Sequence, residues 1–127
     1  MGEIPLRVLL ADDDRDGARS LAALLELEGY EVRTVHGGQD ALDAAREFHP
    51  DVALLDIGMP KITGYEVARR LTQRYGERCP VLVAVTGWKQ ASDKILATLA
   101  GFDHHVAKPY DPNTLISLLA QLPPAAR

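Results

Sequence analysis

The chain has 127 residues, a formal net charge of −4 at pH 7, and 46% hydrophobic against 25% charged residues, a composition typical of a single soluble globular domain. The absence of a run of five like charges and of a lysine–arginine cluster argues against direct binding to nucleic acid or to an anionic membrane. The single cysteine, Cys79, cannot form an internal disulfide, and no apolar stretch approaches the roughly 20 residues that a membrane span needs, so we expect a cytoplasmic protein.

Five short apolar runs, each about as long as a strand, alternate with longer segments along the chain. The runs cover residues 8–11, 30–35, 52–55, 81–85 and, more weakly, 105–107. The segments that follow them repeat apolar residues at the period of a helix, at Leu21, Leu24 and Leu25, at Ala41, Leu42 and Ala45, at Val67, Ala68 and Leu71, at Ile95, Leu96 and Leu99, and at Leu115, Leu118 and Leu119. The sequence therefore predicts five strand–helix units.

Glycine and proline fall where these helices should begin or end. Helix ends are expected next to Gly29, Pro50, Gly76 and Gly101, and a helix start at Pro112. We expect one domain over residues 1–127, with a core of about residues 6–121 and a flexible C-terminal tail over 122–127.

Alternating strands and helices imply a parallel sheet with right-handed crossovers. The first, third and fourth runs lack alternating polar residues, so helices must cover both faces of the sheet. The second run carries Glu31 and Arg33, as an edge strand can. In such sheets, functional groups gather beyond the carboxyl ends of the strands.

Carboxylates follow two of the predicted strands at this edge. Asp12, Asp13 and Asp14 come after the first strand, and Asp56 comes after the third. Neighbouring carboxylates repel one another unless a cation binds, and hard oxygen ligands that leave positions open for water suit Mg²⁺. The alternative for the three aspartates is a solvated helix start, and Asp14 is expected to cap the first helix. Asp12, Asp13 and Asp56 are therefore candidate magnesium ligands.

Groups that complement a phosphoryl group follow the remaining strands. A carboxylate beside Mg²⁺, such as Asp56, can be a ligand or a nucleophile that forms an aspartyl phosphate. Gly58 allows close backbone approach in the loop after Asp56. Thr86 follows the fourth strand with a hydroxyl donor, and Lys108 follows the fifth with a positive charge. The sequence thus predicts a phosphoryl-transfer site at this edge of the sheet.

Four blocks of sequence carry a family resemblance, namely residues 9–14, 56–60 with Gly64, 85–87 and 108–109. Together they resemble the receiver domain of two-component response regulators, over residues 6–121. The resemblance implies a flavodoxin-like α/β fold, a doubly wound sheet of five parallel strands in the order 2-1-3-4-5. It also implies a signalling domain, which catalyses only its own phosphorylation and dephosphorylation.

The same resemblance assigns roles to the residues at the strand ends. It implies that Asp56 is the phosphoacceptor and that Asp12 and Asp13 hold Mg²⁺ together with Asp56. It also implies that Gly58 lends its backbone carbonyl to the metal.

Thr86 and Lys108 resemble the pair that senses the phosphoryl group and completes the catalytic set. Many family members carry tyrosine or phenylalanine three residues before the lysine, where this chain has His105. His105 is therefore either a switch residue or a partly exposed histidine without that role. The resemblance also implies a cis Lys108–Pro109 bond, which would turn the chain sharply after the fifth strand.

The resemblance implies a partner that carries phosphohistidine, either a histidine kinase or a histidine phosphotransfer domain. Residues 100–109 are similar to receiver domains of hybrid sensor histidine kinases, which favours a phosphorelay. A covalently linked kinase or output domain can lie outside this chain.

Four further residues are judged against the inferred site. His36, His49 and His104 fall outside it and are expected at the surface or in loops. Trp88, two residues beyond Thr86, either covers the surface, shields an aspartyl phosphate from water, or packs where the histidine of a partner must approach.

Two other functions are compatible with an α/β sheet. An aspartyl-phosphate phosphatase usually places its nucleophile after the first strand and needs a long cap insertion, for which no loop here is long enough. A flavin or nucleotide module needs a glycine-rich phosphate loop after the first strand, where this chain has three aspartates.

Overall fold

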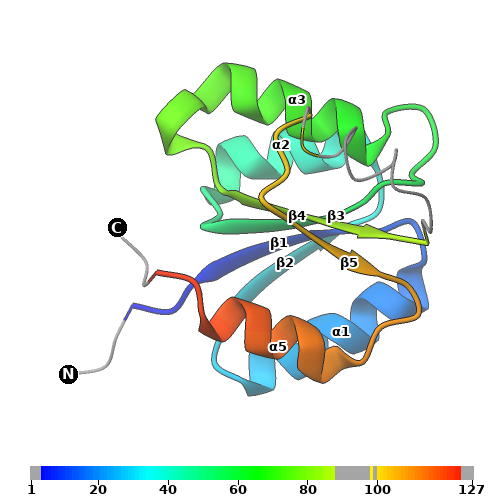
Figure 1. Ribbon diagram of the computed structural model, residues 1–127, viewed down its shortest axis with the longest axis vertical. Helices are drawn as coiled ribbons and strands as arrows, with labels where there is room; N and C mark the ends of the chain where they lie inside the picture. The colour runs from blue at the N-terminus through cyan, green and yellow to red at the C-terminus, as the bar shows by residue number, and fades with distance from the viewer. Residues whose placement is uncertain (1–3, 88–97, 99, 124–127) are drawn as a thin grey trace.

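A sheet of five parallel strands lies at the centre of the computed structural model, which describes residues 4–87, 98 and 100–123 (Figure 1). The strands lie in the order β2 (Glu31–Val35), β1 (Arg7–Ala11), β3 (Val52–Asp56), β4 (Val81–Thr86) and β5 (His104–Ala107). All neighbouring strands pair in parallel. The predicted doubly wound α/β sheet and its strand order are confirmed.

Two strands run one residue further than predicted. Asp56 is the last residue of β3 and pairs in register with Val85, and Thr86 is the last residue of β4 and pairs with Ala107. Sheet pairing therefore holds the backbone of both site residues, which the sequence placed just beyond the strands.

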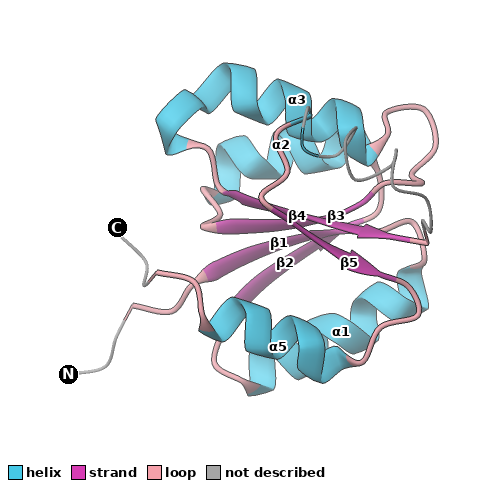
Figure 2. Ribbon diagram, in the orientation of Figure 1, coloured by secondary structure: helices cyan, strands magenta, loops and turns pink. Residues whose placement is uncertain are grey.

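Helices cover both faces of the sheet, as its apolar strands require. Helices α2 (Gly38–Phe48) and α3 (Gly64–Tyr75) lie on one face, and α1 (Arg15–Leu27) and α5 (Pro112–Ala120) lie on the other. Figure 2 shows these three layers by type of secondary structure. Each face thus builds its own half of the core.

The two halves of the core follow the alternation of side chains along the strands. Leu9 and Leu55 pack toward α2 and α3, whereas Val8 and Leu54 pack toward α1 and α5. All four side chains are completely buried. The buried apolar area on both faces fixes the register of the central strands, since a slip of one residue would exchange the two faces.

The predicted starts of two helices are confirmed. Asp14 caps α1, where its Oδ1 accepts from the Gly17 N–H at 3.2 Å. A Cβ atom at Gly17 would lie 2.6 Å from Asp14 Oδ2, so glycine leaves room for this cap. Pro112 opens α5 behind Asp111, which accepts from the Asn113 N–H at 2.9 Å.

The predicted helix ends also agree with the structure. Gly29 follows α1 with a φ of 96°, and Gly76 ends α3 with a φ of 53°, a conformation that glycine adopts without steric cost. Helix α2 ends at His49 in the left-handed region, directly before Pro50.

Some predictions fall on residues that the structure does not describe. The helix expected around residues 95–99 lies mostly outside the described residues, as do residues 124–127 of the expected tail. Within the described part of the chain, no helix has both the length and the apolarity that crossing a membrane requires.

Candidate functional site

The carboxyl edge of the sheet brings Asp12, Asp13 and Asp56 together. Ala11 pairs with Leu55 in register, so the next residues of the two central strands, Asp12 and Asp56, emerge side by side. One carboxylate oxygen from each of the three aspartates lies within 4.8 Å of the others. Asp12 and Asp56 are only 7% and 8% exposed, whereas Asp13 is exposed. The structure therefore assembles the three carboxylates that the sequence predicted.

Backbone amides orient the two buried carboxylates. The Asp14 N–H donates to Asp12 Oδ1 at 2.9 Å, and the Gly58 N–H donates to Asp56 Oδ1 at 3.0 Å. Both bonds come from the residue two positions further along the chain. Each loop thus holds its own strand-end carboxylate.

Lys108 supplies a cation to this acidic cluster. Its Nζ donates to Asp12 Oδ2 at 3.2 Å and lies 3.8 Å from Asp56 Oδ2. Burial alone would lower the pKa of Lys108, but the carboxylates of Asp12 and Asp56 outweigh that effect and raise it. Lys108 is therefore charged and bridges the two buried aspartates, closer to Asp12 than to the predicted phosphoacceptor.

Burial raises the pKa of Asp56 from 3.8 to about 6. The Gly58 N–H and the charge of Lys108 lower this pKa, while the neighbouring Asp12 and Asp13 raise it. Burial and the neighbouring carboxylates therefore outweigh the Gly58 N–H and Lys108 at this residue.

The donor set fits a hard divalent cation. It consists of carboxylate oxygens on three residues within reach of one ion, beside a loop backbone at Gly58. Such oxygen ligands, with positions left for water, are what Mg²⁺ prefers. A divalent ion would also offset the charge that Lys108 leaves uncompensated.

Gly64 lets the loop after Asp56 return close to β3. A Cβ atom at Gly64 would lie 2.6 Å from the Asp56 carbonyl oxygen and 2.9 Å from Ile57 Cα, and neither backbone atom can move cheaply. The Gly64 N–H donates to the Ile57 carbonyl at 3.2 Å. This contact fixes the start of α3 against the end of β3.

Thr86 lies on the strand next to Asp56 and is buried, with 3% of its surface exposed. The Lys108 N–H donates to the Thr86 carbonyl at 2.6 Å, which joins the ends of β4 and β5. The Lys108–Pro109 bond is cis, as predicted. Thr86 and Lys108 therefore reach the site from adjacent strand ends.

His105 lies on β5, where its side chain is exposed while that of the next residue, Val106, is buried. Its role as a switch residue stays a prediction. Trp88 lies outside the described residues, so the roles predicted for it stay predictions.

His36 lies in the loop after β2, as predicted, but it is not outside the site, because its Nδ1 lies 2.9 Å from the backbone carbonyl oxygen of Asp12. The ring is partly buried there. The sequence signal was only that His36 directly follows the second apolar run, and the structure brings it to Asp12 because Val35 pairs with Ala11. His49 and His104 are exposed, as predicted.

This fold and site define a class of doubly wound α/β proteins with a carboxylate cluster and a lysine at the carboxyl edge of the sheet. A comparison with family models shows which family of this class the chain belongs to. The response regulator receiver domain matches residues 8–120, and the chain belongs to that family. Neither a phosphatase nor a flavin or nucleotide module is supported.

Individual relatives agree with this assignment. Response regulator MprA of Mycolicibacterium vanbaalenii is 36% identical over 119 residues, which cover 94% of this chain and 49% of that protein. The chain thus spans about half the length of the curated relatives it matches.

Solved structures show the same fold. Vibrio cholerae chemotaxis protein CheY4 is similar with a TM-score of 0.88 and 26% identity, over 94% of this chain and all of that one (100%). The receiver domain of a signal transduction histidine kinase from Syntrophus aciditrophicus has a TM-score of 0.83 and 25% identity, over 91% of this chain and 88% of that one. The chain is therefore a receiver domain of the two-component type, a signalling domain whose general function is to accept a phosphoryl group.

Proposed function

We propose that this domain accepts a phosphoryl group on Asp56, in a Mg²⁺-dependent transfer from phosphohistidine on a histidine kinase or a histidine phosphotransfer domain. The position of Asp56 is the observation that carries this proposal. Its carboxylate is buried, with the Gly58 N–H on one oxygen and Lys108 Nζ 3.8 Å from the other. A nucleophile, a cation and further metal ligands thus meet around one carboxylate.

Asp13 and Asp56, with the Gly58 carbonyl, are the groups that we expect to hold Mg²⁺, and Asp12 acts directly or through water. The proximity of the three carboxylate oxygens supports this set. When bound, Mg²⁺ offsets the charge of the carboxylates and of the phosphoryl oxygens.

In the proposed transfer, a carboxylate oxygen of Asp56 attacks the phosphorus of phosphohistidine. A phosphorus–oxygen bond forms as the phosphorus–nitrogen bond breaks, and the electron pair of the broken bond stays on the imidazole nitrogen, which then takes up a proton. Lys108 and the Thr86 hydroxyl are expected to donate to the phosphoryl oxygens, since Thr86 ends the strand next to that of Asp56 and Lys108 Nζ lies 3.8 Å from Asp56 Oδ2. The aspartyl phosphate is then the signalling state.

The signal is expected to leave the site through β4 and β5. Thr86 is joined to Lys108 by a backbone hydrogen bond. His105 lies exposed on β5, the strand that ends directly before Lys108. A change in the position of Thr86 would therefore be passed to the surface around His105.

We further propose that residues 6–121 act as one receiver domain in the cytoplasm. The family match over residues 8–120 supports the extent, and the single cysteine supports the compartment. A linked kinase or output domain stays a prediction.

Acetyl phosphate and Mg²⁺, followed by intact-mass measurement, test the site. The wild type is expected to gain one phosphoryl group, and Asp56→Asn is expected to gain none. Asp16→Asn is the matched control, because Asp16 is exposed in the first turn of α1. Full labelling of Asp56→Asn, or equal labelling of the wild type in EDTA, would contradict the proposal.

A further inference from the structure

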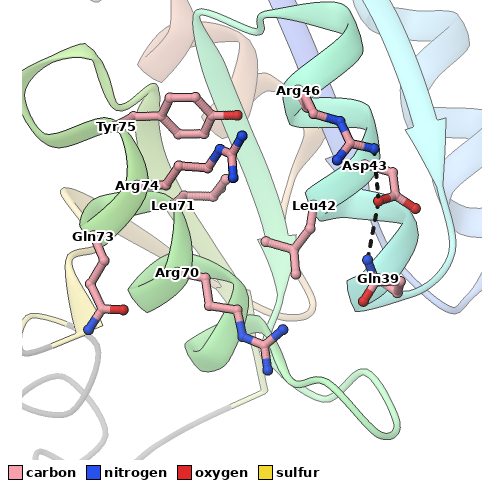
Figure 3. A pocket seen from close by; sticks show the side chains of 9 residues that line it. All are labelled: Gln39, Leu42, Asp43, Arg46, Arg70, Leu71, Gln73, Arg74 and Tyr75. Atoms are coloured by element: carbon pink, nitrogen blue, oxygen red, sulfur yellow. Dashed lines mark hydrogen bonds and ion pairs between the residues drawn. The ribbon is translucent and has the colours of Figure 1, made fainter.

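A groove of about 430 Å³ lies between α2 and α3 (Figure 3). Leu42 from α2 and Leu71 from α3 project into it from its two sides. Arg46 borders it on α2, and Arg70 and Arg74 border it on α3, one helical turn apart. The groove thus combines apolar leucine side chains with arginines on both sides.

The charge of this groove is positive and only partly compensated. Arg46 pairs with Asp43 at 3.6 Å, and Arg70 pairs with Glu66 at 3.1 Å. The guanidinium of Arg74 lies over the Tyr75 ring, 5.7 Å from its centroid, and no carboxylate in the described part of the chain forms an ion pair with it. Three arginines therefore face one lining carboxylate, Asp43.

A second hollow continues this groove. It measures about 460 Å³, shares Tyr75 with the first, and is bordered by Pro50, Arg78 and Pro80. Pro50 and Pro80 precede β3 and β4, so this hollow lies toward the end of the sheet opposite Asp56. The two hollows together thus lead from the α2–α3 groove away from Asp56.

We propose that this α2–α3 groove is a docking surface for an acidic amphipathic segment of a partner protein. Carboxylates one helical turn apart on such a segment match the spacing of Arg70 and Arg74, while its apolar side chains cover the partly exposed Leu42, since Leu71 is buried in the core beneath it with 1% of its surface exposed. Charge complementarity selects this occupant, because a basic segment would be repelled by the excess of arginines over carboxylates in the lining, above all by Arg74, for which no ion pair is found within the described residues. Since the groove lies apart from Asp56, a docked partner leaves the phosphoacceptor accessible.

Nuclear magnetic resonance titration of the ¹⁵N-labelled chain tests this proposal. The probe is an amphipathic peptide of roughly 16 residues, built from Leu, Ala and Glu with glutamates spaced one turn apart. The same peptide with lysine in place of glutamate is the control probe. The acidic peptide is expected to shift the amides of residues 39–46 and 70–75, more weakly at high salt, and the lysine peptide is expected to leave them unchanged.

Matched variants separate a specific contact from net charge. Arg74→Glu is expected to weaken binding of the acidic peptide by about fivefold or more. Arg19→Glu, at an exposed position of α1 on the opposite face of the sheet, makes the same change in net charge and is expected to bind like the wild type. Arg74→Gln, a milder change, is expected to fall between them, and it keeps the test informative where Arg74→Glu disturbs the end of α3.

Several outcomes would overturn the proposal. These are equal weakening by Arg19→Glu, shifts spread over the whole surface, and an absence of shifts at millimolar peptide. If inorganic phosphate shifts the same amides at concentrations as low as the peptide does, the groove is a site for small anions. A concentration-dependent dimer that Arg74→Glu dissociates would make the occupant a second copy of the chain. Phosphorylation of Asp56 is measured separately by mass, so failure here leaves the phosphoacceptor assignment unaffected.

Discussion

Asp56 is a charged residue that the folded protein stabilises poorly. It is 8% exposed, close to two other carboxylates, and its pKa is raised by burial to about 6. The folded state therefore binds the proton of Asp56 more tightly than the unfolded chain does, so the stabilisation present at low pH is lost as pH rises from about 4 through about 6. The buried carboxylate of Asp56 is therefore expected to lower the stability of the metal-free domain near neutral pH.

Asp56→Asn is accordingly expected to stabilise the metal-free domain at pH 8 by about 1–2 kcal/mol, because it removes a buried negative charge. At pH 4 the two proteins should have nearly equal stability, since Asp56 is then protonated. Urea unfolding in EDTA across this pH range measures the difference. The control, Asp16→Asn, removes an exposed charge from the first turn of α1 and should not stabilise the domain at pH 8. A stabilisation by Asp56→Asn that is the same at both pH values would contradict the explanation.

His36 is expected to position Asp12, whose carbonyl oxygen lies 2.9 Å from its Nδ1. His36→Ala removes this contact and should weaken Mg²⁺ binding about fivefold, the effect of one lost hydrogen bond. His36→Asn places an amide nitrogen near the position of Nδ1 and should restore much of the affinity. Isothermal titration with MgCl₂ measures both, with the exposed His104→Ala as control. Wild-type affinity in His36→Ala would exclude the role.

Single residues differ in how far the sequence could predict them. The sequence predicted that the strand ends carry Asp12, Asp56 and Lys108. Because the carboxyl ends of parallel strands lie at one edge of the sheet, it also predicted that these residues meet. His36 follows an edge strand of mixed polarity, so its approach to Asp12 depends on the register of β1 and β2, which the sequence did not specify. The sequence likewise could not show that Lys108 lies closer to Asp12 than to Asp56, because side-chain geometry decides this.

At the scale of elements, glycines at close contacts determine how loops meet strands. Gly64 begins α3 against the backbone of Asp56 and Ile57, whereas Gly37 precedes α2 with open space around its Cβ position. The sequence predicted these helices from apolar period and caps. The sequence could not show which glycine has no room for a side chain, since that depends on how closely another segment of backbone approaches it.

Gly64→Ala is expected to destabilise the domain by about 1–3 kcal/mol, because the new methyl group would lie 2.6 Å from the Asp56 carbonyl oxygen. The end of β3 must shift to accommodate it, so phosphorylation by acetyl phosphate should also slow. Gly37→Ala is the matched control and should change stability by less than about 1 kcal/mol. Thermal unfolding and timed intact-mass measurement provide the two readouts. Equal effects of the two substitutions would show that the contact at Gly64 is unimportant.

At the scale of the whole molecule, the edge of the sheet and its two faces carry different surfaces. The carboxyl edge brings together the three aspartates and Lys108, while the helices on both faces form the surface away from that edge. Alternating strands and helices predicted this architecture, because a parallel sheet must be covered on both sides. The grouping of Arg46, Arg70 and Arg74 could not be predicted, since it depends on how α2 and α3 lie beside each other.

Phosphorylation is expected to change hydrogen exchange beyond the site itself. A stable phosphoryl mimic with Mg²⁺ should alter exchange of the amides of residues 100–106, through Thr86 and the backbone bond that joins it to Lys108. Mass spectrometry of peptides from the exchanged protein measures this effect, with Asp56→Asn as the negative control. Changes confined to the loop after Asp56 would argue against a switch.

The ammonium of Lys108, held between Asp12 and Asp56, also determines which ions can compete for the site. A sodium or potassium ion would bring one positive charge, and a tethered group with that same charge is already present at no cost in translational entropy. Only an ion of higher valence improves on it. We therefore expect the site to select by ionic charge, so that a magnesium titration keeps its midpoint when potassium chloride is exchanged for sodium chloride at constant ionic strength.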